Sequence, residues 1–216
     1  MCVNYKPTDA EMLEAMSGLS VAGLPPWKEQ VWQDYPAPII LADPDSGGSK
    51  LALATYGMIP KDKMPPGKRL TTLNARSETI GEKRSYAGAW RAAQTCLVPT
   101  MAFYEPNWES GKAERWEIGM ADGAPFYVAG LWRAWDDGSR LSFTQLTINA
   151  DEHSLMKHFH KPGDEKRSLV IIPRDQADEW LEVGNPEIAR AYLQAYPAEL
   201  MRAAPAKTGY GGKSQS

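Results

Sequence analysis

The pattern of apolar and polar positions predicts that β-strands dominate this chain. Phe126–Trp135 is almost wholly apolar and residues 141–148 are rich in strand-forming residues, and the Asp-Asp-Gly turn between them predicts a hairpin. A second pair of strands is expected at residues 36–41 and 51–56, on either side of a turn rich in Asp, Gly and Ser. Shorter apolar runs predict further strands at residues 3–5, 95–98, 101–105, 115–121 and 168–172.

Helical signals are short and lie between these strands. The segment from Thr8 to Glu11 has the pattern of a capping box, and the apolar positions after it are spaced for one helix face. Four further helical segments are predicted: residues 85–93, residues 152–159, a segment capped by Asp175, and a last segment begun by Asn185 and Pro186. We therefore predict an α+β fold in one domain, a curled and mostly antiparallel sheet or barrel with peripheral helices.

A chain of 216 residues is long enough for one domain with a full core. We assign residues 1–204 to this domain and expect residues 205–216, where Thr, Gly, Lys and Ser dominate, to form a flexible tail. The N-terminal segment has charges among its apolar positions and no long apolar run follows, so neither a secretory signal nor a membrane span is predicted. We expect a cytoplasmic monomer.

Positive charge is concentrated in one stretch, although the whole chain has a net charge of −3. From Lys61 to Arg91 eight basic residues stand against three acidic ones, so this stretch has a charge of +5 and the remainder −8. Such an asymmetry suits a surface that faces phosphate groups, and a solvated face with scattered lysines explains it equally well. The basic residues are Lys61, Lys63, Lys68, Arg69, Arg76, Lys83, Arg84 and Arg91.

The second residue, Cys2, offers chemistry that an internal cysteine lacks. Removal of Met1 leaves a thiol and an α-amine on one residue, with reference pKa values of about 8.5 and about 7.7–8.0. Such an amine can form a Schiff base with an aldehyde. The neighbouring thiol can then add to the imine carbon and close a five-membered thiazolidine ring. The alternative is that Cys2 is an ordinary second residue.

Three further side chains are candidates for chemistry, and each also has an ordinary explanation. Asn74 begins a turn-forming run that includes Arg76 and Glu78. Glu105 ends a predicted strand just before a proline, and His160 ends a predicted helix. From the residues alone, Glu105 is also consistent with a solvated or salt-bridged carboxylate, and His160 with a structural histidine.

The histidines do not predict a metal site. His153, His158 and His160 come without a cysteine or carboxylate at familiar ligand spacing, so we predict no metal and no cofactor. Two cysteines cannot make a disulfide framework, and a reducing compartment keeps both as thiols. Cys96 lies in an apolar run and is expected to be a buried, inert thiol.

Taken together, these stretches resemble the SRAP family (SOS response-associated peptidase), whose members are also described as abasic-site processing proteins. No single segment is specific, but their order along the chain is. The matching segments are Met1-Cys2, 56–60 (YGMIP), 74–79 (NARSET), 96–99 (CLVP), 103–105 (FYE), 129–132 (AGLW), 144–150 and His160.

The resemblance implies a covalent link between the protein and an abasic site in single-stranded DNA, with association to the nucleoid when damaged DNA is bound. Cys2 would attack the ring-opened aldehyde and form the thiazolidine. Asn74 would bind the Cys2 terminus or the ring oxygen, Glu105 would shuttle protons, and His160 would act as a general acid or base. The implied DNA contacts are Arg76, whose planar fork suits phosphate, and Lys61, Lys63, Lys68, Arg69 and Lys161.

The chain departs from the family pattern in three places. Val3-Asn4 stands where the family commonly has Gly-Arg, which removes an arginine that could contact phosphate. Lys61-Asp62-Lys63 replaces a tryptophan that could stack on a base, and Lys161-Pro162 replaces an Asp-Arg-x-Pro run. These changes bear on DNA affinity and leave the residues of the cross-linking chemistry in place.

Two other functions are compatible with the sequence. An amidohydrolase or amidotransferase with an N-terminal nucleophile also exposes a terminal cysteine, and a glutamine analogue would label Cys2 without DNA. A non-catalytic module that binds single-stranded DNA would give salt-sensitive binding that Cys2→Ala leaves intact. The peptidase activity in the family's name is interpreted as removal of the protein's own Met1.

Overall fold

The computed structural model describes residues 3–67 and 70–206, and five of its strands close into a mixed barrel. The long strand β5 pairs with β2 on one side and with β7 on the other, which closes the ring. One pairing in the ring, between β3 and β8, is parallel, and the others are antiparallel. In order around the barrel the strands are β5 (Thr95–Asn107), β7 (Phe126–Trp135), β8 (Arg140–Asn149), β3 (Gly48–Tyr56) and β2 (Pro36–Asp43).

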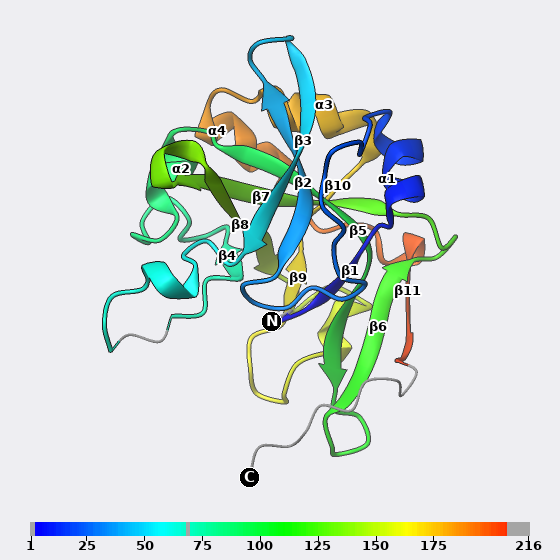
Figure 1. The fold of residues 1–216 in the computed structure, drawn as a ribbon. Coiled ribbons are helices and arrows are strands. Elements are labelled where there is room, and N and C mark those ends of the chain that lie inside the picture. Colours follow the sequence, from blue (N-terminus) through cyan, green and yellow to red (C-terminus); the bar gives the residue numbers. More distant parts are fainter. Residues whose placement is uncertain (1–2, 68–69, 207–216) are drawn as a thin grey trace.

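Six shorter strands extend this barrel (Figure 1). β1 (Tyr5–Pro7) and β6 (Glu114–Met120) pair with β5, and β11 (Met201–Pro205) pairs with β6. The remaining three are β4 (Asn74–Arg76) and β9 (Arg167–Leu169), both on β8, and β10 (Ile171–Ile172) on β7.

The helices are short and peripheral, as the sequence predicts. In Figure 1, α2 and α4 lie at the upper left and α1 at the upper right, while β6 and β11 project below. The α-helices are α1 (Ala10–Ser17), α2 (Ala87–Arg91), α3 (Ala177–Glu182) and α4 (Pro186–Ala189). The 3-10 turns are η1 (Lys61–Lys63), η2 (Asp136–Gly138), η3 (Met156–His158), η4 (Arg174–Gln176), η5 (Arg190–Tyr192) and η6 (Ala198–Leu200). Among the described residues, no helix has the length and apolar character needed to cross a membrane.

The barrel is filled by aromatic side chains from several strands. The rings of Tyr5 and Tyr56 meet edge-on with centroids 5.3 Å apart, and Tyr56 stacks on Phe143 at 5.2 Å. All three are fully buried. Because side chains alternate along a strand, the opposite faces of the same strands form a second apolar cluster, which includes Trp90 of α2 and Trp180 of α3.

The predicted caps are confirmed at α4, displaced by one residue at α1 and wrong at α3. The predicted capping box has Thr8 at the N-cap of α1, but the Asp9 side chain caps this helix instead by accepting from the Met12 N–H. The Asn185 side chain accepts from the Glu187 N–H and caps α4. The residue before α3 is Gln176, which makes no capping bond. Asp175 lies inside the 3-10 turn η4 instead.

Three predicted elements are wrong in length or type. The predicted strands 95–98 and 101–105 are one strand, because Pro99 is accommodated opposite Tyr127 without a break. The predicted helix 152–159 is only the turn η3, because the His153 ring accepts from two backbone N–H groups that a helix would use, those of Leu155 and Met156.

The C-terminal third also differs from the prediction. The expected strand 168–172 is two strands, because the chain crosses from β8 to β7 at Val170, whose N–H donates to Leu146 and whose carbonyl accepts from Ala129. The strand β11 was not predicted, since its sequence lacks alternation and only pairing with β6 specifies it. Pairing reaches Pro205 and Ala206, beyond the predicted domain boundary at residue 204. The rest of the predicted tail, residues 207–216, lies outside the described residues.

The close approach of β5, β7 and β8 depends on Gly130, and this gives a stability prediction. A Cβ at this position would lie 2.7 Å from the Cys96 Sγ and 2.9 Å from the Thr144 carbonyl oxygen. Gly130→Ala should therefore lower the free energy of unfolding by about 1–3 kcal/mol, the usual cost of overpacking. Urea unfolding measures the change.

Gly88 of α2 is the matched control, because nothing lies within 4 Å of the Cβ that alanine would add there. Gly88→Ala should stabilise the protein by about 0.5–1 kcal/mol, since it only removes backbone freedom from the unfolded chain. Equal unfolding free energies for Gly130→Ala and the wild type would show that the strands can separate at this point without cost.

Candidate active site

Glu105 and His160, far apart in the sequence, are in contact inside the protein. The Glu105 Oε2 and His160 Nε2 atoms lie 3.3 Å apart, and the two residues are only 4% and 7% exposed. Glu105 stands near the end of β5, opposite Trp116 of β6. A buried carboxylate beside a buried imidazole is costly unless it is compensated or used, so this pair is the first candidate for chemistry.

Backbone contacts hold the segment around His160 against β5. The His160 N–H donates to the Pro106 carbonyl at 2.9 Å, and the preceding Phe159 forms a bridge to Asn107. His160 itself has a φ of 66°, in the left-handed region that non-glycine residues rarely adopt. Phe159 packs edge-on against Trp116, with ring centroids 6.0 Å apart. Backbone strain of this kind clusters at functional sites.

Both ring nitrogens of His160 are buried, and neither makes a hydrogen bond among the described residues. The Nε2 atom faces the Glu105 carboxylate at 3.3 Å without meeting hydrogen-bond geometry. Buried polar atoms without partners are few in native proteins and call for an explanation. An imidazole beside a carboxylate is an arrangement used for proton transfer, which keeps this pair as the candidate for chemistry.

Asn74 is positioned by the barrel itself. It begins β4, is 8% exposed, and pairs in parallel register with Gln145 of β8. Its carbonyl accepts from the Tyr86 hydroxyl at 3.0 Å. The Tyr56 hydroxyl donates to the Gln145 side-chain oxygen at 2.9 Å, which connects this position to the aromatic interior. The backbone of Asn74 is thus fixed by contacts on both sides.

The N-terminal segment runs beside β5 toward Glu105. β1 is antiparallel to β5 with Tyr5 opposite Phe103, so the chain from Lys6 back to Asn4 follows β5 in the direction of Glu105. Asn4 is 2% exposed, and its side-chain amide donates to Gln30 at 3.3 Å. Cys2, the predicted nucleophile, lies outside the described residues.

The predicted DNA contacts are dispersed, and two of them have acidic partners. The Arg76 guanidinium donates to Glu165 at 2.6 Å, and Lys63 forms an ion pair with Asp136. The side chains of Lys61 and Lys161 are exposed. Lys68 and Arg69 lie outside the described residues.

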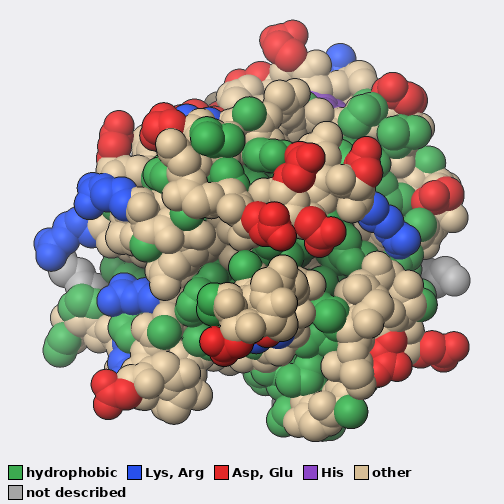
Figure 2. Space-filling model, turned by 90° about the horizontal axis from the view of Figure 1, so that it is seen from above, with side chains coloured by type: hydrophobic (Ala, Val, Ile, Leu, Met, Phe, Trp, Pro, Cys, Tyr) green, Lys and Arg blue, Asp and Glu red, His purple; other side chains and the backbone are tan. Residues whose placement is uncertain are grey.

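The charge on one face of the molecule does not favour DNA binding there. Figure 2 views the molecule from above, and acidic side chains lie across this face while most of the visible Lys and Arg side chains lie toward its edges. A phosphate backbone would meet unfavourable charge there. The predicted contact Arg76 is the last residue of β4, which pairs with β8.

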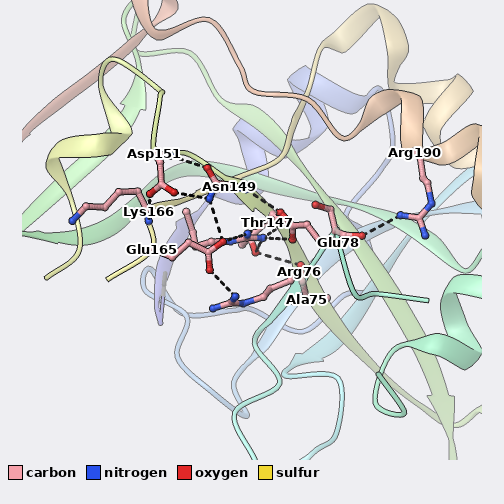
Figure 3. Close-up of polar contacts among 11 residues, drawn as sticks. Ala75, Arg76, Glu78, Thr147, Asn149, Asp151, Glu165, Lys166 and Arg190 are labelled. Carbon is pink, nitrogen blue, oxygen red and sulfur yellow. Dashed lines mark hydrogen bonds and ion pairs between the residues drawn. The ribbon is translucent and has the colours of Figure 1, made fainter. Parts of the chain in front are cut away.

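The sequence did not reveal a buried arginine that organises the surroundings of Arg76. Arg167 is 2% exposed and donates to both carboxylate oxygens of Glu78 at 2.8 and 2.9 Å, to Glu165 at 2.8 Å and to the Thr147 carbonyl at 2.7 Å. Figure 3 shows these contacts converging between β4, β8 and the segment that precedes β9. The partners are as many as 89 residues apart in the sequence, so no local motif reveals them.

Both carboxylates around Arg167 are ionised at neutral pH. Burial acts to raise the pKa of Glu78, but hydrogen bonds from Arg167 outweigh it and leave the pKa below its ordinary value. The same balance applies to Glu165, where burial is outweighed by hydrogen bonds from Arg167 and Asn149 and the pKa is again lowered. For Arg167, burial acts to lower the pKa, and hydrogen bonds to the two carboxylates raise it overall.

Comparison with known proteins identifies the family. The family model described as SOS response associated peptidase (SRAP) matches residues 1–210. The chain belongs to the SRAP family. A solved structure of a protein from Bordetella bronchiseptica superposes on this SRAP chain with a TM-score of 0.84 and 34% identity, covering 95% of this chain and 100% of that one. A structure from Bacteroides thetaiotaomicron shares the fold at 21% identity, with a TM-score of 0.71, covering 96% of this chain and 93% of that one.

Curated relatives have a common name. The abasic site processing protein YoaM of Bacillus subtilis is 29% identical over 164 residues, which are 74% of the SRAP chain and 69% of YoaM. The abasic site processing protein HMCES of Xenopus tropicalis is 24% identical over 189 residues, 77% of the SRAP chain and 55% of HMCES.

The other reactive side chains of the SRAP chain have separate structural roles. The His153 Nε2 lies 2.8 Å from the Tyr196 carbonyl, and His158 forms an exposed ion pair with Glu109 at 2.8 Å. Cys96 is buried, and burial raises the pKa of its thiol well above the ordinary range. The prediction that Cys96 is a buried thiol is therefore confirmed.

The ion pair between Glu78 and Arg167 should make a contribution to stability that depends on pH. Because the folded pKa of Glu78 is lower than its ordinary value of 4.5, its contribution is fully present above pH 4.5 and is lost as pH falls through the folded pKa. Glu78→Gln should destabilise the protein at pH 7 by about 1–3 kcal/mol, the cost of leaving a buried donor poorly satisfied.

Urea unfolding of wild type and Glu78→Gln at pH 7 and at pH 3 measures this contribution. The difference between the two proteins should shrink at pH 3, because a protonated Glu78 resembles glutamine. Glu152→Gln, at an exposed position, should match wild type at both pH values. A Glu78→Gln difference that is the same at both pH values would contradict an ionic role for Glu78.

Proposed function

We propose that this protein processes abasic sites in single-stranded DNA by forming a covalent thiazolidine link through Cys2 once Met1 is removed. The observation that carries the proposal is the buried contact between Glu105 and His160 at the end of β5 toward which the N-terminal segment runs. The names of the curated relatives, abasic site processing proteins, support a role at abasic sites.

The proposed reaction needs no cofactor and releases one water. The neutral α-amine of Cys2 adds to the aldehyde carbon of the ring-opened deoxyribose, and the resulting carbinolamine loses water to give an imine. The Cys2 thiol then adds to the imine carbon, and its proton ends on the nitrogen. The products are a five-membered ring that joins the protein to the sugar, and one molecule of water.

The buried pair supplies the proton transfers of these steps. Loss of the carbinolamine hydroxyl requires an acid, and addition of the amine requires a base. We assign these transfers to Glu105 and His160, whose contact lets one group restore the proton of the other. Asn74 would position the Cys2 amine or the sugar oxygen through its side-chain amide.

DNA binding in this proposal depends on charge and on the missing base. Arg76, Lys61, Lys63, Lys68, Arg69 and Lys161 would contact phosphates. An abasic sugar in a single strand has no base of its own to unstack, so presenting it to a pocket costs less than flipping an intact nucleotide. The peptidase activity of the family name is assigned here to removal of Met1.

Cross-linking of an abasic single strand tests the proposal. Wild type should give a product that survives heat and SDS, and Cys2→Ala should abolish the thiazolidine product. Glu105→Gln and His160→Ala should slow its formation by about 10²–10⁴-fold, the range for a positioned acid or base. Denaturing gels of timed samples measure the rates.

His158→Ala is the matched control, because His158 is an exposed neighbour whose partner is Glu109 rather than Glu105. It should cross-link at the wild-type rate. The mechanism is wrong if Cys2→Ala forms the same product as wild type, or if His158→Ala slows the reaction as much as His160→Ala does.

A further inference from the structure

The carboxylate of Glu165 contacts two arginines, one of which is buried and the other half-exposed. Its Oε2 atom lies 2.6 Å from the Arg76 Nη1, and its Oε1 atom lies 2.8 Å from the Arg167 Nη1. The Arg76 side chain is 46% exposed, whereas that of Arg167 is 2% exposed. Oε1 also accepts from the Asn149 side-chain amide at 3.3 Å. Glu165 is therefore anchored on its inner side and presents one oxygen to an arginine at the surface.

The anchor of Glu165 does not depend on Arg76. The next residue, Lys166, donates its N–H to Asp151 at 2.8 Å, and its ammonium donates to the carbonyls of His160 and Lys161 at 3.2 and 3.1 Å. Figure 3 shows Asp151, Lys166 and Asn149 on one side of Glu165, with Arg76 on the other. The Glu165 carboxylate can stay in place when the Arg76 guanidinium turns outward.

The Glu165 carboxylate occupies one donor of Arg76, the Nη1 group, that a phosphate would also use. Arginine binds carboxylate and phosphate through the same planar set of N–H donors, so the two anions exclude each other at one edge of the guanidinium. A phosphate that displaces Glu165 must also approach an anchored negative charge. Both effects weaken the binding of DNA at this point.

We infer that Glu165 competes with DNA phosphate for Arg76 and so lowers affinity for the DNA backbone. The inference rests on the proposed function, in which Arg76 contacts phosphate. Weaker binding to the DNA backbone improves discrimination between damaged and undamaged strands. An undamaged strand is held only through its phosphates, whereas an abasic strand also reacts in the pocket. Glu165 would therefore make retention on DNA depend on the damaged sugar.

Equilibrium binding to a strand that cannot react isolates this effect. The probe is a fluorescent single-stranded oligonucleotide with one tetrahydrofuran site, which lacks the aldehyde, and the readout is anisotropy of the full chain. Glu165→Gln should lower the Kd by about two- to five-fold, the range for a half-exposed ion pair. Arg167 keeps both oxygens of Glu78 and the Thr147 carbonyl in this variant, so the fold should persist.

Two further variants separate competition from a general change of charge. Glu152→Gln removes one exposed negative charge from a neighbouring turn and should lower the Kd less than Glu165→Gln does. In an Arg76→Ala background the gain from Glu165→Gln should disappear. Arg76→Ala alone should reduce the slope of log K against log salt by about one, as expected for one lost phosphate contact.

The inference is overturned if Glu165→Gln binds no more tightly than Glu152→Gln, if its gain persists without Arg76, or if Arg76→Ala binds as wild type does. Cross-linking to a true abasic site is measured in parallel and reports on the proposed function alone. A wild type that forms no adduct yet shows the expected anisotropy pattern would refute the covalent chemistry and leave the competition at Arg76 standing.

Discussion

The pairing of β5 with four other strands is the constraint on which the rest of the structure depends. β2 and β7 pair with it to close the barrel, and β1 and β6 pair with its second half. Glu105 lies where that second half emerges from the barrel, so the same strand that closes the core also carries the candidate acid or base. Because β1 runs antiparallel to β5, the chain from Lys6 back to Asn4 runs toward the same place.

Arg167 and His160 are both buried but differ in their polar contacts. Arg167 donates through both Nη atoms to carboxylate and carbonyl oxygens, while its Nε makes no hydrogen bond among the described residues. Several hydrogen bonds to a buried charge indicate a structural role. His160 has a left-handed backbone, and neither of its ring nitrogens makes a hydrogen bond within the described part of the chain. This unmet capacity favours His160 over Arg167 as the candidate for chemistry.

The sequence predicted those features that depend on neighbouring residues. The start of α1, the cap of α4 and the hairpin of β7 and β8 are decided within a few residues, and they are confirmed, although Asp9 rather than Thr8 caps α1. The α+β fold class predicted from the strand pattern is confirmed. The family resemblance pointed to Glu105 and His160, which the structure places in contact, and their roles stay predictions. Their ordinary explanations could not be excluded from the sequence, because burial and contact depend on how distant strands pair.

Features specified by distant partners were not predicted. β11 has no strand pattern of its own and forms because β6 offers an edge. The predicted helix before His160 is replaced by a turn because the His153 ring binds its backbone N–H groups. Glu165, 89 residues from Arg76, shows no sign in the sequence of its role beside that arginine. In each case the deciding interaction becomes visible only after the chain has folded.

The intact mass of the protein, alone and after mixing with a single strand that contains one abasic site, tests the central claim most directly. The account predicts a chain without Met1 that gains the mass of the DNA strand less one water. An unchanged mass, or an adduct that forms equally well on a chain retaining Met1, would contradict it.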